Sequence, residues 1–175
     1  MGSSTIPRTP SREQSNALFS PCNEYRYLLT RPGSSDEGEA GPTVFLMLNP
    51  STADHLVDDP TIRRCRGFAT AWGGASLVVL NLYALRSPDP AALWNHRDPV
   101  GPENDRWLLE HARAHRDIVC AWGNNAGPER VRTVAQMLLA GGARLWCLGT
   151  TKRGAPKHPL YVRADQPRIP WAPPT

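Results

Sequence analysis

The chain has 175 residues with a formal net charge of +4, and 40% of its residues are hydrophobic and 21% charged. This composition is that of a soluble globular domain and excludes a disordered or collagen-like chain. No apolar run approaches the ~20 residues that a membrane-spanning helix needs, and the N-terminus lacks the pattern of a secretory signal. We therefore expect a cytoplasmic protein with no membrane partner.

The two ends of the chain differ in composition from its middle. Residues 1–16 are rich in Ser, Thr, Pro and Arg, which predicts a disordered segment. Residues 17–165 are predicted to form a single α/β domain, and residues 166–175 a proline-rich tail. Residues 150–175 carry five basic residues against one acidic residue. Such a segment suits phosphate or nucleic acid, although a solvated tail explains it equally well.

Strand and helix patterns alternate through the middle of the chain. Predicted strands cover residues 44–48, 77–80, 118–122 and 145–148, after a short strand or hairpin arm within residues 19–29. Predicted helices begin at Asp59-Pro60, Pro102-Glu103 and Pro128, and glycine pairs at 73–74 and 141–142 end the first and the last. This alternation indicates βαβ units with parallel strands. We predict a three-layer α/β/α sandwich with a mainly parallel central sheet.

Two asparagines stand where predicted strands end. Asn49 follows residues 44–48 and is held by Pro50, and Asn81 follows residues 77–80. The carboxyl ends of parallel strands meet at one sheet edge, where open α/β sheets bind ligands. An amide there can orient a water molecule or read the polar edge of a base. The alternatives are a turn asparagine at position 49 and a side chain that bridges adjacent loops at position 81.

The later strand ends add further candidates. Trp122, which precedes Gly123 and Asn124, can lay its ring beside a base, or it can belong to the core. With Asn124 it completes the predicted base contacts at this edge. We predict phosphate contacts from four polar or basic residues near the strand ends: Ser51, Thr150, Lys152 and Lys157.

A histidine and three aspartates are the titratable candidates. His158 lies between two prolines and beside a lysine, which suits a fixed electrophile, although a lone loop histidine is often incidental. Asp54, Asp58 and Asp59 form a cluster that could hold magnesium or supply a general base. Asp59 is already explained as the cap of the helix that begins at Pro60.

Cysteine spacing and known motifs argue against cofactor chemistry. The four cysteines stand singly, with no C-x-x-C pair, which predicts reduced structural thiols. The chain has no Walker loop, G-x-G-x-x-G, G-x-S-x-G or H-E-x-x-H motif. We therefore predict no metal site and no cofactor.

Four short motifs resemble a widespread bacterial domain family of unknown function. They are residues 46–54 (LMLNPSTAD), 58–64 (DDPTIRR), 81–83 (NLY) and 158–161 (HPLY). The resemblance extends over about residues 19–162. It is specific, but it implies no reaction.

The order of elements also resembles, more distantly, the uracil-DNA glycosylase superfamily. Residues 47–51 are similar to the Gly-x-Asn-Pro-Gly water-activating motif of its mismatch-specific branch, and residues 158–160 to its His-Pro-Ser motif. The resemblance implies that Asn49 positions the hydrolytic water, that Asn81 reads the base, and that His158 lies against the leaving base or the backbone. Phe68 is the nearest match to the stacking aromatic. Both glycines of the first motif and the serine of the last are replaced in this chain.

The first functional hypothesis is a glycosylase-like hydrolase that cleaves the N-glycosidic bond of a base, modified or not, in nucleic acid or a nucleotide. Its catalytic residues would be Asn49, Asp54 and His158, and its base contacts Asn81, Trp122, Asn124 and Phe68. The alternative is a non-catalytic module that binds nucleic acid or a nucleotide on the same fold. A magnesium-dependent nuclease or phosphohydrolase is a third possibility, and it rests on the aspartates alone.

Overall fold

A computed structural model describes residues 15–33 and 40–175 of the chain. Within these ranges the strands are β1 (Asn16–Phe19), β2 (Arg26–Pro32), β3 (Thr43–Met47), β4 (Ser76–Asn81), β5 (Asp117–Cys120), β6 (Arg144–Cys147) and β7 (Ile169–Pro170). The α-helices are α1 (Pro60–Ala71), α2 (Ala92–Asn95), α3 (Asn104–Ala114) and α4 (Pro128–Ala140). Two short 3-10 helices, η1 (Gly123–Asn125) and η2 (Pro159–Tyr161), lie in the loops.

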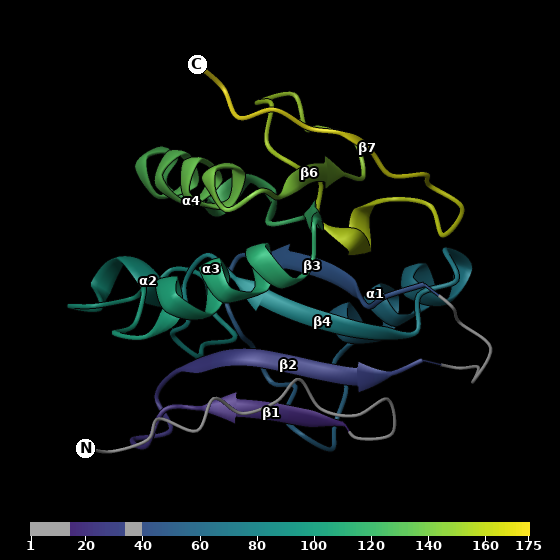
Figure 1. Cartoon of the computed structure of the whole chain (residues 1–175). Coiled ribbons are helices and arrows are strands. Elements are labelled where there is room, and N and C mark those ends of the chain that lie inside the picture. Colours follow the sequence, from purple (N-terminus) through teal and green to yellow (C-terminus); the bar gives the residue numbers. More distant parts are fainter. Residues whose placement is uncertain (1–14, 34–39) are drawn as a thin grey trace.

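The described strands form one mixed sheet in the order β1-β2-β4-β3-β5-β6-β7 (Figure 1). The central strands β4, β3, β5 and β6 are parallel, while β2 joins β4 antiparallel and β7 joins β6 antiparallel. The predicted α/β class is confirmed, but the prediction of a mainly parallel sheet is wrong. The reason is that the predicted N-terminal arm enters the sheet as β1 and β2, which extend it antiparallel beyond β4.

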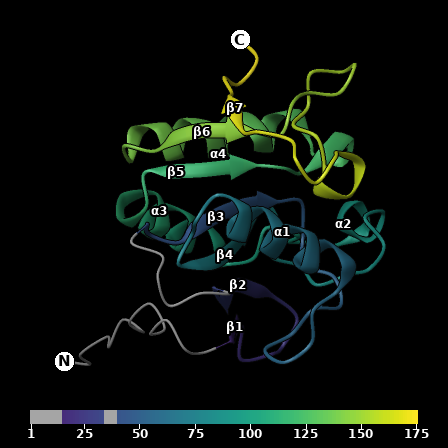
Figure 2. The same ribbon diagram turned by 90° about the vertical axis from the view of Figure 1, so that its right-hand side faces the viewer.

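Helices cover both faces of the sheet. Figure 2 looks onto the face covered by α1, with α3 and α4 behind the sheet. The apolar stripe of α1, which includes Ile62, Cys65 and Phe68, packs on Phe45 and Val79. On the other face, α3 and α4 pack on a second buried cluster that contains alternate residues of the same strands. Each central strand is therefore buried on both sides, as its unbroken apolar sequence requires.

Helix α1 starts and stops at the signals seen in the sequence. The Asp59 side chain accepts a hydrogen bond from the Ile62 amide at 2.9 Å, and Pro60 occupies the first turn. Such a cap stabilises a helix by about 1 kcal/mol. Gly73 follows the last turn with φ of +71°, a left-handed conformation that side chains with a Cβ rarely adopt. The start of α1 is thereby fixed next to the carboxyl ends of β3 and β4.

The structure also describes the C-terminal segment that the sequence predicts as a tail. Residues 169–170 pair with β6, and the Trp171 ring packs perpendicular to Trp122 with centroids 5.2 Å apart. At the other end, residues 1–14 of the predicted disordered segment lie outside the described residues, and Asn16 begins β1. The four cysteines are free, and three of them are buried. None of the helices in the described ranges has the length and hydropathy to cross a membrane.

Candidate active site

A cavity of about 630 Å³ opens at the sheet edge where β3, β4 and β5 end. Its walls come from these strand ends, the start of α1, η1 and the segment around η2. The cavity brings together seven of the residues predicted from the sequence: Asn49, Ser51, Asn81, Trp122, Asn124, Lys157 and His158. These residues come from four separate stretches of the chain, and the parallel strands account for their convergence.

The Asn49 amide is fixed by the backbone around it. Its Nδ2 donates to the carbonyl oxygens of Pro50 at 3.1 Å, Leu85 at 3.2 Å and Ser87 at 3.0 Å. These bonds hold the loop after β4 against the loop after β3. Since the nitrogen is used in this way, Oδ1 is the atom of the amide that can accept a hydrogen bond from a ligand or a water. Asn49 thus has the predicted turn role and also faces the cavity.

Asn81, the last residue of β4, lines the cavity. Its side chain is 1% exposed, and its Nδ2 has no hydrogen-bond partner in the described part of the chain. The strand end itself is held by Asn104, whose Nδ2 donates to the Asn81 carbonyl at 3.0 Å. A buried amide donor left without a partner costs about 1–3 kcal/mol. The Asn81 side chain therefore lines the cavity with an unpartnered donor and does not bridge adjacent loops through any hydrogen bond that the structure gives it.

His158 precedes η2 and presents one nitrogen to the cavity. Its Nδ1 accepts a hydrogen bond from the Leu160 amide at 3.2 Å, which leaves the ring proton on Nε2 when the imidazole is neutral. Burial lowers the pKa of His158 from its ordinary value, and nearby Asp59 opposes this shift. The ring is therefore neutral at pH 7 and offers Nε2–H as a donor.

The segment around His158 is tied to α1. Arg64 donates from Nε to the Pro159 carbonyl at 3.2 Å and from Nη2 to the Val162 carbonyl at 2.5 Å. These bonds anchor both ends of η2 on the helix. The imidazole is consequently held in place by the prolines in its own sequence and by a neighbouring element.

The wall after β5 depends on a glycine. Gly123 has φ of +75°, and its amide donates to the Pro156 carbonyl at 2.9 Å, so the chain turns sharply past the His158 segment. Trp122 before it is 4% exposed and packs on the C-terminal segment, so it is a core residue with one side at the cavity. Asn124 lies at the rim, where its Oδ1 accepts from the Thr151 hydroxyl at 2.7 Å.

Four predicted site residues do not line the cavity. Phe68 is 1% exposed in the core cluster on the α1 face of the sheet. The Asp54 carboxylate accepts from the Leu56 and Val57 amides, both at 2.8 Å, and these bonds lower its pKa. Thr150 and Lys152 are exposed in the loop after β6.

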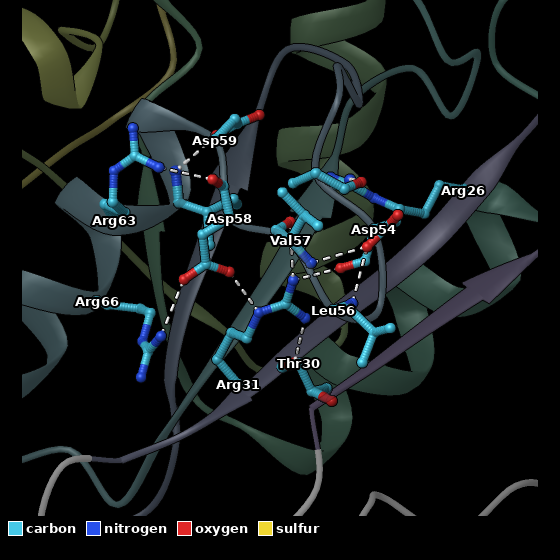
Figure 3. A network of polar contacts seen from close by, with 12 residues as sticks. Arg26, Thr30, Arg31, Asp54, Leu56, Val57, Asp58, Asp59, Arg63 and Arg66 are labelled. Atoms are coloured by element: carbon cyan, nitrogen blue, oxygen red, sulfur yellow. Dashed lines mark hydrogen bonds and ion pairs between the residues drawn. The ribbon is translucent and has the colours of Figure 1, made fainter.

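The loop that follows Asn49 is held by buried arginines. Figure 3 shows Arg26 and Arg31 of β2 reaching the loop from one side, with Arg63 and Arg66 of α1 on the other. Arg31 Nε donates to the Asp58 carboxylate at 2.6 Å, and its other nitrogens reach the Thr30, Asp54 and Val57 carbonyls. Burial raises the pKa of Asp58, but the hydrogen bonds from Arg31 and Arg66 outweigh it and lower the pKa.

Each aspartate of the predicted acidic cluster makes contacts that stabilise the local fold. Asp58 pairs with Arg31 and Arg66, Asp54 closes a turn, and Asp59 caps α1. Across the described ranges, no group of three or more histidine, cysteine or acidic side chains is arranged to hold a metal ion.

Several cavity residues were not among the site residues predicted from the sequence, and three of them carry a charge or an exposed ring. Asp59 was interpreted as a member of the acidic cluster and as a helix cap, and it also lines the cavity. Tyr161 is 83% exposed at the end of η2 and lines the cavity mouth, 5.7 Å from the His158 ring. Arg26 lines the inner wall and is 2% exposed. The only signal for Arg26 in the sequence is a charged residue next to the apolar residues of a strand pattern, and Arg31 of the same strand gives the same signal.

A β-bulge turns Arg26 toward the cavity. Leu18 of β1 lies opposite Leu28, but the next residue, Phe19, lies opposite Arg26, so Tyr27 is an extra residue in β2. The strict alternation of a strand would place Arg26 on the same face as Leu28. The extra residue reverses this, as bulges beside functional sites commonly do.

Comparison with known families gives one match. Residues 26–160 match the model of the family described as Protein of unknown function (DUF1643). The chain belongs to this family. The match confirms the resemblance to an uncharacterised domain family, and the matched region runs from Arg26 through His158. No curated protein and no solved structure matches the chain significantly.

Proposed function

We propose that this DUF1643 protein hydrolyses the N-glycosidic bond of a nucleobase that enters the cavity. The observation that carries the proposal is the Asn81 amide, which is buried without a hydrogen-bond partner at the end of a cavity shared with Asn49 and His158. An amide is complementary to the adjacent donor and acceptor on the edge of a base. A volume of about 630 Å³ is within the usual range of small-ligand sites.

The cavity residues supply the groups that this reaction needs. Water attacks the sugar C1′ while the bond from C1′ to the base nitrogen breaks. The electron pair leaves with the base, and the proton that the water loses ends on the released base, so the products are the free base and the sugar hydroxyl. The Oδ1 atom of Asn49 accepts a hydrogen bond from the attacking water and orients it. The neutral His158 donates from Nε2 to the oxygen on which the departing base gathers negative charge, which is the costly part of the reaction.

We assign the catalytic carboxylate to Asp59 in place of Asp54, with a different role. Its carboxylate lies in the cavity wall, with one oxygen fixed by the helix cap. A fixed negative charge stabilises the positive charge that develops on the sugar as the base departs. Asp54 has no such position, since its carboxylate closes a turn outside the cavity wall.

The proposal extends to the fold and to the ligand. Helices on both faces of the sheet support a three-layer sandwich of the uracil-DNA glycosylase kind, as the motif resemblance implies. Lys157 and the exposed Tyr161 lie on the open side, where a phosphate and a second ring can be bound. The ligand is thus a nucleotide, free or flipped out of a nucleic acid.

The test is release of free base from a panel of nucleosides, nucleotides and oligonucleotides with normal and modified bases, followed by mass spectrometry. Asn49→Ala should reduce release by about 100-fold or more, since orientation of the attacking group is lost. Asn95→Ala, an exposed asparagine of α2 outside the cavity wall, is the matched control and should release base at the normal rate.

Unchanged release by the Asn49→Ala protein would refute the assignment. Salt-sensitive binding of a nucleotide or oligonucleotide without release of base would instead support the non-catalytic binding module. The three hydrogen bonds from Asn49 to backbone carbonyls are compatible with that second function, because they give the residue a structural reason to be present.

A further inference from the structure

The cavity contains a buried guanidinium with unused hydrogen-bond donors. Arg26 donates from Nη1 to the Ala53 carbonyl at 2.5 Å, while its Nε has no partner in the described part of the chain. Its side chain is 2% exposed and lines the cavity. No carboxylate in the described ranges forms an ion pair with it.

This arginine stays charged. Burial lowers the pKa of Arg26 to about 10, with Asp59 opposing the shift and the positive charges of Arg31 and Arg86 adding to it. The group is therefore protonated at neutral pH despite its desolvation. A buried charge without a counter-ion is expensive, and proteins usually pair it or let it lose its charge. Arg26 keeps its charge and forms no ion pair with a described residue, although the carboxylates of Asp59 and Asp54 lie near enough to favour the charged form.

The position of Arg26 indicates which part of a ligand it meets. Its backbone amide bonds the Ala84 carbonyl, just beyond the end of β4, so Arg26 and Asn81 lie on neighbouring strands at one sheet edge. Both side chains are almost fully buried. Lys157 is half-buried, and Tyr161 marks the exposed mouth. Arg26 thus belongs to the inner end of the cavity, next to the amide that we assign to base recognition.

We propose that Arg26 binds an anionic oxygen group of the ligand, a carboxylate or a phosphate, beside the base read by Asn81. The inference rests on the proposed function in taking a nucleobase compound as the ligand. The free donors of a guanidinium match two oxygens of such a group. The ligand would supply the direct ion pair that no described carboxylate makes, so the cavity should prefer an acidic base derivative or a nucleotide to its uncharged analogue.

The first experiment measures whether small anions occupy the site. Inorganic phosphate and acetate are titrated at constant ionic strength, and the midpoint of thermal unfolding is followed. We expect the midpoint of the wild-type protein to rise with either anion and that of Arg26→Gln to stay constant. Arg153→Gln is the matched control, since it removes an exposed cation outside the cavity wall and should keep the response. No shift in the wild type, or an equal shift in Arg26→Gln, would overturn the inference.

The second experiment identifies the source of the anion by calorimetry with two probe pairs. Uracil is compared with uracil-5-carboxylic acid, and uridine with uridine 5′-monophosphate. The charged member should bind about tenfold or more tightly, because a charge-assisted hydrogen bond contributes at least this much. A preference in the first pair assigns the group to the base, and one in the second pair to a phosphate. Equal binding within both pairs, or a preference that survives in Arg26→Gln, would contradict the proposal.

Neither experiment depends on turnover. If anions bind through Arg26 but no base is ever released, the anion site stands and the hydrolase proposal fails. If base is released equally well by wild type and Arg26→Gln, and from charged and neutral substrates alike, the hydrolase proposal stands and the anion site fails. The melting curve of Arg26→Gln without ligand shows whether the variant is folded.

Discussion

The two buried arginines of β2 reach the same loop and differ in what they leave unbonded. Arg31 is fully used: it pairs with Asp58, which also binds Arg66, and it bonds three backbone carbonyls. Arg26, five positions earlier, donates from Nη1 to the Ala53 carbonyl, and its Nε has no partner among the described residues. Both are 2% exposed, so burial alone does not distinguish them. Saturated hydrogen bonding marks the structural arginine, and unsatisfied bonding beside a cavity marks the candidate for ligand binding.

Two buried asparagines show a weaker contrast, since the Oδ1 of Asn104, like the Nδ2 of Asn81, has no hydrogen-bond partner in the described residues. Asn104 Nδ2 donates to the carbonyls of Asn81 and Leu82, at 3.0 and 3.1 Å, and so fixes the end of β4. Asn81 Nδ2, at the cavity, has no partner in the described residues. In each pair, one residue stabilises the fold and the other is positioned by it. Substitutions that separate stability from binding can therefore test the comparison.

The largest effect is expected at Arg31. Arg31→Met leaves the Asp58 carboxylate with only the half-exposed Arg66 and should cost about 3–5 kcal/mol of unfolding free energy, as breaking a buried ion pair does. Urea denaturation measures it. The double variant Arg31→Met/Asp58→Asn removes both charges and should recover part of the loss. A cost below about 1 kcal/mol, the range of surface pairs, would show that the pair is not structural.

Burial lowers the pKa of the buried His111 as it lowers that of Arg26, but the histidine loses its charge at neutral pH whereas the arginine keeps it. Burial and the neighbouring His115 lower the pKa of His111 to about 4, so it is neutral in the fold, whereas its ordinary value is 6.5. Between these values the unfolded chain binds more protons, so stability falls as the pH is lowered. The loss approaches about 3 kcal/mol at pH 4. Urea denaturation between pH 7 and pH 4 should show this decrease in unfolding free energy. The decrease should be smaller in His111→Leu and unchanged in His55→Gln, the control at an exposed histidine.

The asparagine pair should give a smaller difference. Asn104→Ala removes the donor to the Asn81 carbonyl and should cost about 2 kcal/mol, since a buried acceptor loses its partner. Asn81→Ala removes a donor that has no hydrogen-bond partner among the described residues, so it should lower the unfolding free energy by less. It should nevertheless weaken ligand binding. Thermal unfolding and calorimetry with uridine 5′-monophosphate measure the two properties. Equal losses of stability would contradict the distinction between the two residues.

The smallest effect is expected at Arg26. Arg26→Met removes a charge that has no counter-ion, which stabilises the fold, and leaves the Ala53 carbonyl without its donor, which destabilises it. The two changes should nearly cancel, so unfolding free energy should change by about 1 kcal/mol or less. Denaturation in parallel with Arg31→Met gives the comparison directly. A loss as large as that of Arg31→Met would show that Arg26 is structural.

Local signals in the sequence were enough for the central elements. Long apolar runs end at Asn49 and Asn81, and Asp59 with Pro60 begins α1, because each of these features depends on near neighbours in the chain. The convergence of the asparagines and His158 on one edge follows from parallel strands. The cavity is formed at that edge.

What the sequence did not predict depends on pairing between distant segments. The antiparallel position of β2 beside β4 and the bulge at Tyr27 are set by partners far away in the chain, so the direction of Arg26 was not visible. Asp54 and Asp59 are the same residue type in one short segment, and only the loop geometry imposed by Arg31 distinguishes their positions. Phe68 follows the helical period of α1 and lies in the core, where that period places it.

The C-terminal strand has a practical consequence for work on this protein. Trp171, held in place by β7, supports the indole of Trp122 from behind, and Trp122 forms part of the cavity wall. A truncation before Ile169 would remove the contact between Trp171 and Trp122. A bulky fusion joined close after Trp171 would disturb the same contact. Weak activity in a shortened or C-terminally tagged preparation would therefore reflect a loosened wall as readily as a wrong substrate.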